Sequence, residues 1–162
     1  MKLLISDANI FIDVKVGKLI EVMFQLPESF AVPNILYEEE LLERHPELPS
    51  YGLQVLEIEE SFMQEAYRLR GVYSHPGQND LFALALAKQE QCPLLTGDKK
   101  LRAVAKAEDV VVRGTLWLIE RLYQERKITI TAVEQAYARM KEEGRRLPWK
   151  QVDAQIRKFR KQ

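Results

Sequence analysis

The chain has 162 residues, of which 46% are hydrophobic and 30% charged, and its formal net charge is zero. This composition is typical of one soluble domain with a single core, and it excludes disordered, collagen-like and disulfide-dense chains. The longest apolar runs, such as residues 81–87, are far shorter than the roughly 20 residues of a membrane-spanning helix. The apolar start of the chain stops at Ser6, which is too early for a signal peptide. We therefore expect a protein without a membrane segment that stays in the cytoplasm.

The charges are distributed unevenly along the chain. From residue 141 onward eight basic residues stand against three acidic ones, whereas residues 38–40 are consecutive glutamates. A basic end can hold an anionic partner, and it is also typical of an ordinary solvated helix face. The one cysteine, Cys92, cannot form an internal disulfide or a cysteine-rich zinc site, which agrees with a reducing compartment.

Short apolar runs alternate with helical spacing through the first two thirds of the chain. The runs predict strands at residues 2–6, 30–32, 53–58, 93–96 and 110–112. The spacing between them predicts helices at residues 10–23, 35–42, 60–70, 79–90 and 101–107. Because parallel strands need crossovers, and crossovers cover both faces, this order predicts an α/β fold, a three-layer α/β/α sandwich with a central parallel sheet.

The remainder of the chain is predicted to be helical. Three amphipathic helices are expected at residues 117–126, 132–143 and 149–159. The sequence contains no internal repeat, and no low-complexity linker separates these helices from residues 1–115. We therefore expect residues 1–115 to form the principal domain and residues 116–162 to form a helical C-terminal extension packed on it.

Acidic residues follow the predicted strands. Asp7 comes directly after the first strand, Asp98 follows the strand at residues 93–96, and Asp80 opens the helix that leads into that strand. The glutamates at residues 38–40 lie on the helix after the second strand. Because ligands of open parallel sheets bind outside the carboxyl ends of the strands, these acids are expected to meet at one edge of the sheet.

Carboxylates gathered at one site repel one another unless a cation offsets their charge. Mg²⁺ and Mn²⁺ prefer oxygen ligands and leave positions for water and for a substrate phosphate. The pattern therefore predicts a Mg²⁺ or Mn²⁺ site that hydrolyses a phosphodiester through a metal-activated water. Each aspartate taken alone also fits a helix N-cap, and the glutamates fit a solvated face, so the expected convergence is what favours a site.

Four segments of the sequence resemble the PIN-domain ribonucleases. They are SDANIFID at residues 6–13, VPNILYEEEL at 32–41, NDLFALA at 79–85 and LTGDKKL at 95–101. Their order and spacing agree with that family over roughly residues 1–115. Residues 112–116 and the helices after them resemble a PIN branch with a helical C-terminal extension.

The resemblance implies a metal-dependent endoribonuclease that leaves a 5′-phosphate. Its catalytic and metal-binding residues would be Asp7, one glutamate of residues 38–40, Asp80 and Asp98, supported by Asn9 and Thr96. Among the glutamates, helical spacing favours Glu39, because it shares a face with the apolar residues 35, 36 and 42 and is expected to point toward the sheet; Glu38 is the second choice.

The resemblance also implies partners. Many relatives are VapC-like toxins of toxin–antitoxin pairs, so it implies an RNA substrate, a homodimer and a small antitoxin protein that covers the acidic groove. The basic residues after position 141 would help to hold the RNA backbone, because an acidic site repels RNA until a cation binds.

Three other functions stay open on the sequence. A haloacid-dehalogenase-like phosphohydrolase also has an aspartate after its first strand, but it has an Asp-x-Asp pattern where this chain has Asn9. A receiver domain has an aspartate after its third strand, and none follows residues 53–58. A catalytically silent PIN scaffold that acts as a binding module would contain the same acids. Phosphate-loop, dinucleotide and Gly-x-Ser-x-Gly motifs are absent.

Overall fold

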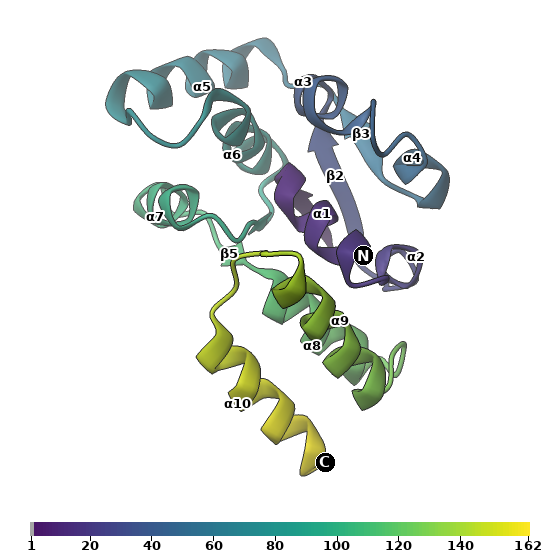
Figure 1. Ribbon diagram of the computed structural model, residues 1–162. Coiled ribbons are helices and arrows are strands. Elements are labelled where there is room, and N and C mark those ends of the chain that lie inside the picture. Colours follow the sequence, from purple (N-terminus) through teal and green to yellow (C-terminus); the bar gives the residue numbers. More distant parts are fainter. Residues whose placement is uncertain (1) are drawn as a thin grey trace.

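A five-stranded sheet runs through the computed structural model, which describes residues 2–162. Three of its strands, β2, β3 and β5, are labelled in Figure 1. The strands are β1 (Leu3–Ser6), β2 (Ser29–Pro33), β3 (Gln54–Leu56), β4 (Leu94–Leu95) and β5 (Val112–Arg113). Their order is β3-β2-β1-β4-β5, and every neighbouring pair is parallel. Strands β1, β2 and β4 are buried over most of their length because apolar residues fill both of their faces.

Helices cover both faces of this sheet. They are α1 (Ala8–Val16), α2 (Ile20–Met23), α3 (Asn34–Leu36), the π-helical turn η1 (Tyr37–Leu41), α4 (Leu48–Tyr51), α5 (Glu60–Val72), α6 (Gln78–Glu90), α7 (Lys99–Ala107), α8 (Thr115–Gln124), α9 (Ile130–Glu142) and α10 (Trp149–Arg160). Helix α6 packs on β1, β2 and β4 and also on α5, whereas α8 and α9 pack on α1. The predicted α/β/α sandwich around a parallel sheet is confirmed.

One apolar core extends from the sheet into the last helices. Residues 81–87 of α6 are all buried, which explains their unbroken apolar sequence. Leu118, Val133 and Phe159 of the C-terminal helices belong to the same buried cluster as Leu4 and Ile5 of β1. Helices α8 to α10 form the green-to-yellow part of Figure 1, in which α10 leads to the C-terminus.

The predicted helix at residues 10–23 is wrong in its continuity, because the structure has two helices there. Helix α1 ends at Val16 and α2 begins at Ile20. Between them, Gly17 lies where an added Cβ would be 2.8 Å from the methyl carbon of Met140 and 3.1 Å from the Cβ of Ala136. Lys18 then has a positive φ of 60°, which turns the chain away from the helix. The break thus lies at the close contact between α1 and α9, which no local pattern reveals.

The predicted regular α-helix at residues 35–42 is also wrong in its geometry. Residues 37–41 form a π-helical turn, in which the Leu42 N–H donates to the Tyr37 carbonyl at 2.8 Å. One extra residue in the turn shifts the faces that α-helical spacing would predict. The spacing argument for Glu39 therefore does not hold, and its place has to be read from its contacts.

Among residues 2–162, none of the helices combines the length and the apolar character of a membrane span.

Candidate functional site

The carboxyl ends of β1 and β4 lie side by side at the centre of the sheet. The chain proceeds from β1 toward β2 and β3 on one side, while β4 leads to β5 on the other. In open α/β sheets, the point where the strand order reverses in this way is where ligands bind. The Asp7 N–H donates to the Leu95 carbonyl at 3.1 Å, so the residues that follow the two strands leave the sheet together.

Asp7 is buried at this point. It is 1% exposed and caps the N-terminus of α1, where its Oδ1 accepts the Ile10 N–H at 3.2 Å. The hydroxyl of Thr96 donates to its Oδ2. Burial, with smaller contributions from the negative charges of Asp80 and Asp13, raises the pKa of Asp7 to about 7, although those two hydrogen bonds oppose the rise. Asp7 therefore exchanges a proton near neutral pH.

Thr96 connects Asp7 with the segment of Asp98. Its buried hydroxyl donates to Asp7 and accepts the backbone N–H of Asp98 at 3.1 Å. Asp98 caps α7, and its Oδ1 accepts the Leu101 N–H at 2.9 Å. One hydroxyl group thus fixes both aspartate-bearing segments at the switch point.

Asp80 completes what we call the acidic edge, namely Asp7, Asp80 and Asp98. It lies in the first turn of α6. Its pKa is raised to about 6, first by burial and then by the negative charges of Asp98 and Glu40. The three aspartates are therefore close enough for their charges to interact, as the sequence predicted.

The three glutamates of η1 are exposed, and they differ in their neighbours. Glu39 accepts a hydrogen bond at 2.9 Å from the side-chain amide of Asn79, the residue before Asp80. Glu40 contributes to the raised pKa of Asp80 through its charge. Glu39 and Glu40 thus lie beside Asp80, and the assignment of Glu39, or of Glu38 in second place, as a metal ligand stays a prediction.

The donor set of the acidic edge suits a hard divalent cation. Only carboxylate oxygens are present. Beside burial, the negative charges of Asp80 and Asp13 raise the pKa of Asp7, and those of Asp98 and Glu40 raise the pKa of Asp80, a repulsion that a cation would offset. Within residues 2–162, no three acidic, histidine or cysteine side chains already surround one point where an ion could be held. The chemistry of these donors fits Mg²⁺ or Mn²⁺.

Behind the acidic edge lies a second polar group that sequence reasoning missed. Buried Asp13 pairs with the Arg145 Nε at 2.5 Å and accepts the Thr115 hydroxyl at 3.1 Å. Burial raises the pKa of Asp13, while the bond from Arg145 opposes this. Arg145 also donates to Asn9 at 3.5 Å. The loop between α9 and α10 therefore reaches the site and holds the predicted support Asn9.

A local signal existed for only one member of this group. Asp13 interrupts the apolar run of residues 10–14, and a charge in such a run needs a buried partner. That partner, Arg145, is 132 residues away along the chain. No spacing rule connects the two.

Arg70 is a further residue that the sequence did not identify. From the end of α5, its guanidinium donates to the carbonyls of Ser74 at 2.9 Å and Pro76 at 2.7 Å. It also donates to the side chain of Gln78 at 3.3 Å. These bonds hold the loop that precedes Asp80, so Arg70 positions that carboxylate.

Comparisons with known proteins show the family and the fold of the chain. The family model DUF3368, described as a PIN domain, matches residues 3–161. A chain in the crystal structure of VapBC2 from Rickettsia felis, bound to a DNA fragment from their promoter, has a similar fold, with 15% sequence identity and a TM-score of 0.51. That alignment covers 69% of this chain and 98% of the other. No curated protein sequence matches the chain.

Proposed function

The chain belongs to the PIN-domain family, and from this premise we propose that it is a metal-dependent endoribonuclease that hydrolyses RNA phosphodiester bonds at the acidic edge. The observation that carries the proposal is the position of Asp7 and Asp98. Both follow the strands at the switch point of the sheet, and the Thr96 hydroxyl contacts both segments. Asp7 and Asp80, two carboxyl groups of the acidic edge whose pKa values are raised first by burial, fit a cation-dependent reaction.

The residues of the acidic edge and their neighbours would have different roles in this reaction. Asp7, Asp80, Asp98 and Glu39 are the proposed ligands of Mg²⁺ or Mn²⁺, which would lower the pKa of a bound water and offset charge on the leaving oxygen. Thr96 orients Asp7 through its hydrogen bond. Because the pKa of Asp7 is about 7, this carboxyl has to lose its proton before it binds a cation. Cation affinity is therefore expected to rise between about pH 6 and pH 8.

The partner and the location belong to the same proposal. The likeness in fold to a chain of VapBC2 supports the proposal that this chain is a VapC-like toxin. We expect it to form a homodimer in the cytoplasm and to be silenced by a small antitoxin protein. Family membership favours this nuclease over the haloacid-dehalogenase-like phosphohydrolase, whose second aspartate is replaced by Asn9.

Cleavage of a pool of structured and single-stranded RNA tests the proposal. The partner-free protein is assayed with Mn²⁺, with Mg²⁺ and with excess chelator, beside Asp7→Asn and Asp98→Asn. Asparagine caps helices about as well as aspartate, so both variants should keep their circular dichroism spectrum. We expect cleavage that requires the metal and that falls at least about 100-fold in each variant.

The matched control is Glu108→Gln, the same chemical change just after the other end of α7. This variant should cut RNA as the parent does. Full activity in Asp98→Asn would overturn the site. A folded protein that cuts no RNA with either metal would favour the silent scaffold, and hydrolysis of a generic phosphomonoester instead of RNA would favour the phosphohydrolase.

A further inference from the structure

A pocket of about 200 Å³ lies beside the acidic edge. Gly97, between Thr96 and Asp98, forms part of its wall, as does buried Asp13. Three arginines from separate segments line it, namely Arg102 of α7, Arg113 of β5 and Arg146 of the loop before α10. Residues far apart in the sequence thus bring positive charge to one hollow next to the carboxylates.

These three arginines lack acidic partners, which sets them apart from other arginines of the chain. Among the described residues none of the three forms an ion pair. Arg113 donates only to the carbonyl of its neighbour Val112, at 3.2 Å. By contrast, Arg68, Arg121 and Arg160 are each paired with a glutamate. The pocket therefore holds positive charge that the protein itself does not neutralise.

The carboxylate of Asp13 in the pocket wall does not neutralise the three arginines. Asp13 is already paired with Arg145 at 2.5 Å and bonded to Thr115. The start of α8 also lines the pocket, and its N-cap, Gly114, has no side chain to satisfy the free backbone N–H groups. The field of these groups adds to that of the arginines. Every uncompensated charge at the pocket is thus positive.

We propose that this pocket is a phosphate subsite that holds a backbone phosphate of the RNA strand next to the phosphodiester cleaved at the acidic edge. The inference rests on the proposed function. Arginine presents paired donors that match phosphate oxygens. The acidic edge repels a polyanion, so a nearby cationic hollow supplies the attraction that positions the strand. The pocket volume is below the roughly 300–1,000 Å³ of pockets for whole small molecules, and it suits a phosphate group with part of its sugar.

Arg113 and Arg146 are suitable for substitution because both are exposed. The double variant Arg113→Gln/Arg146→Gln therefore removes charge without opening the core. Arg157→Gln is the matched control, since Arg157 is also exposed, forms no ion pair with a described residue and lies on α10 outside the pocket wall. All three proteins carry Asp98→Asn, so that the probe is not cut.

The probe is a fluorescein-labelled single-stranded RNA, and anisotropy is measured over a range of salt concentrations. We expect the double substitution to raise the Kd roughly 10-fold and to reduce the slope of log K against log salt by about one for each arginine removed. Arg157→Gln should change neither value appreciably. In the cutting background, the double substitution should raise KM and leave kcat within about twofold, as expected for a positioning site.

An unchanged Kd and salt slope in the double variant would overturn the subsite. An equal loss in Arg157→Gln would overturn it as well, because the effect would then be that of general surface charge. The binding measurement does not depend on cleavage. If the parent protein cuts no RNA but the arginine pair still governs RNA binding, the proposed function fails while the phosphate subsite stands.

Discussion

Helices α6 and α7 each carry charged residues at both ends, and the two ends behave in opposite ways. At the N-terminal ends lie Asp80 and Asp98 of the acidic edge. At the C-terminal ends lie Lys88, in the last turn of α6, and Glu108, directly after α7. The pKa of Asp80 is raised to about 6, whereas the pKa of Glu108 is lowered to about 2.

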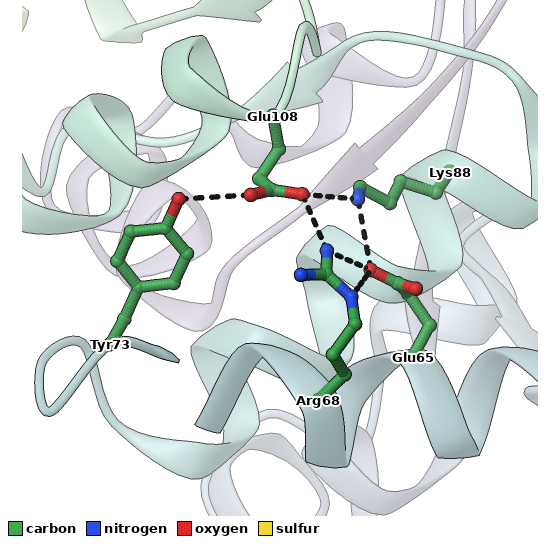
Figure 2. A network of polar contacts seen from close by, with 5 residues as sticks. All are labelled: Glu65, Arg68, Tyr73, Lys88 and Glu108. Carbon is green, nitrogen blue, oxygen red and sulfur yellow. Dashed lines mark hydrogen bonds and ion pairs between the residues drawn. The ribbon is translucent and has the colours of Figure 1, made fainter. Parts of the chain in front are cut away.

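The C-terminal ends are held by a closed network of five residues, Glu65, Arg68, Tyr73, Lys88 and Glu108 (Figure 2). One oxygen of Glu108 accepts from Lys88 and from Arg68, each at 2.7 Å, and the other accepts the Tyr73 hydroxyl at 2.9 Å. Glu65 accepts from the same two cations, at 2.5 Å from Arg68 and at 3.1 Å from Lys88. Two positive charges thus meet two negative charges, and α5, α6 and α7 are joined.

The difference in pKa shifts indicates different roles for the N-terminal and C-terminal ends of α6 and α7. The network satisfies every carboxylate with a cation from the chain, so it stabilises the fold. The acidic edge gathers carboxylates against their mutual repulsion, and within residues 2–162 none of its three aspartates forms an ion pair. Carboxylates left without a partner in the folded chain are the ones that an external cation can bind.

The largest effect should come from removing the least favourable charge, by Asp7→Asn. Asp7 ionises near 3.8 in the unfolded chain and near 7 in the folded protein, so the folded state holds the proton more tightly. The unfolding free energy of the metal-free protein therefore falls as the pH rises through this range. Three pKa units correspond to on the order of 4 kcal/mol, so Asp7→Asn should be more stable than the parent by up to about that amount at pH 8.

Urea denaturation in chelator at about pH 5.5 and about pH 8 measures this difference. The gap between variant and parent should be smaller at the lower pH by about 2 kcal/mol, because Asp7 is protonated there in the folded state. Added Mn²⁺ should stabilise the parent and leave the variant nearly unchanged. A parent protein whose stability does not vary between the two pH values would show that the edge carries no unfavourable charge.

The second largest effect on stability is expected from Arg145→Met, because this change would leave Asp13 without an ion pair, like the three aspartates of the acidic edge. Asp13 is 6% exposed and would lose its cationic partner. Breaking such a pair leaves a buried charge uncompensated, and we expect a loss of about 2–3 kcal/mol in the unfolding free energy, measured in urea at neutral pH. Adding Asp13→Asn should recover most of that loss. Equal destabilisation in the single and double variants would instead assign the effect to packing.

The features of the acidic edge that depend on local sequence pattern could be predicted from the sequence. The sequence predicts Asp7 directly after one strand and Asp98 just after another, each at a helix start, and the structure confirms both positions. An apolar run that ends in an aspartate with a helical pattern beyond it contains the strand, the turn and the N-cap within a few residues. The order of the elements then placed both residues at one edge.

The rest depends on contacts that no local pattern contains. Arg145 meets Asp13 across 132 residues, and α1 ends where Gly17 touches α9. The π-helical turn η1 changes the helix faces on which the glutamates lie, and the composition of the segment does not reveal this change. The network at the other end joins Arg68 with Glu108, 40 residues apart. Such pairings follow from the packing of helices that are already formed.

Glu108→Gln is expected to have the smallest effect on stability, and it tests only the network at the C-terminal ends of α6 and α7. Because the pKa of Glu108 is lowered to about 2, its contribution to stability is present above about pH 4.5 and is lost as the pH falls toward 2. Arg68 is half exposed and screened by solvent, so we expect a loss of only about 1–2 kcal/mol at neutral pH. Urea denaturation should show this gap closing near about pH 3, with RNA cleavage unchanged. If cleavage fell while stability did not, the two ends of α7 would be coupled, and the separation of a stabilising end from a reactive one would be wrong.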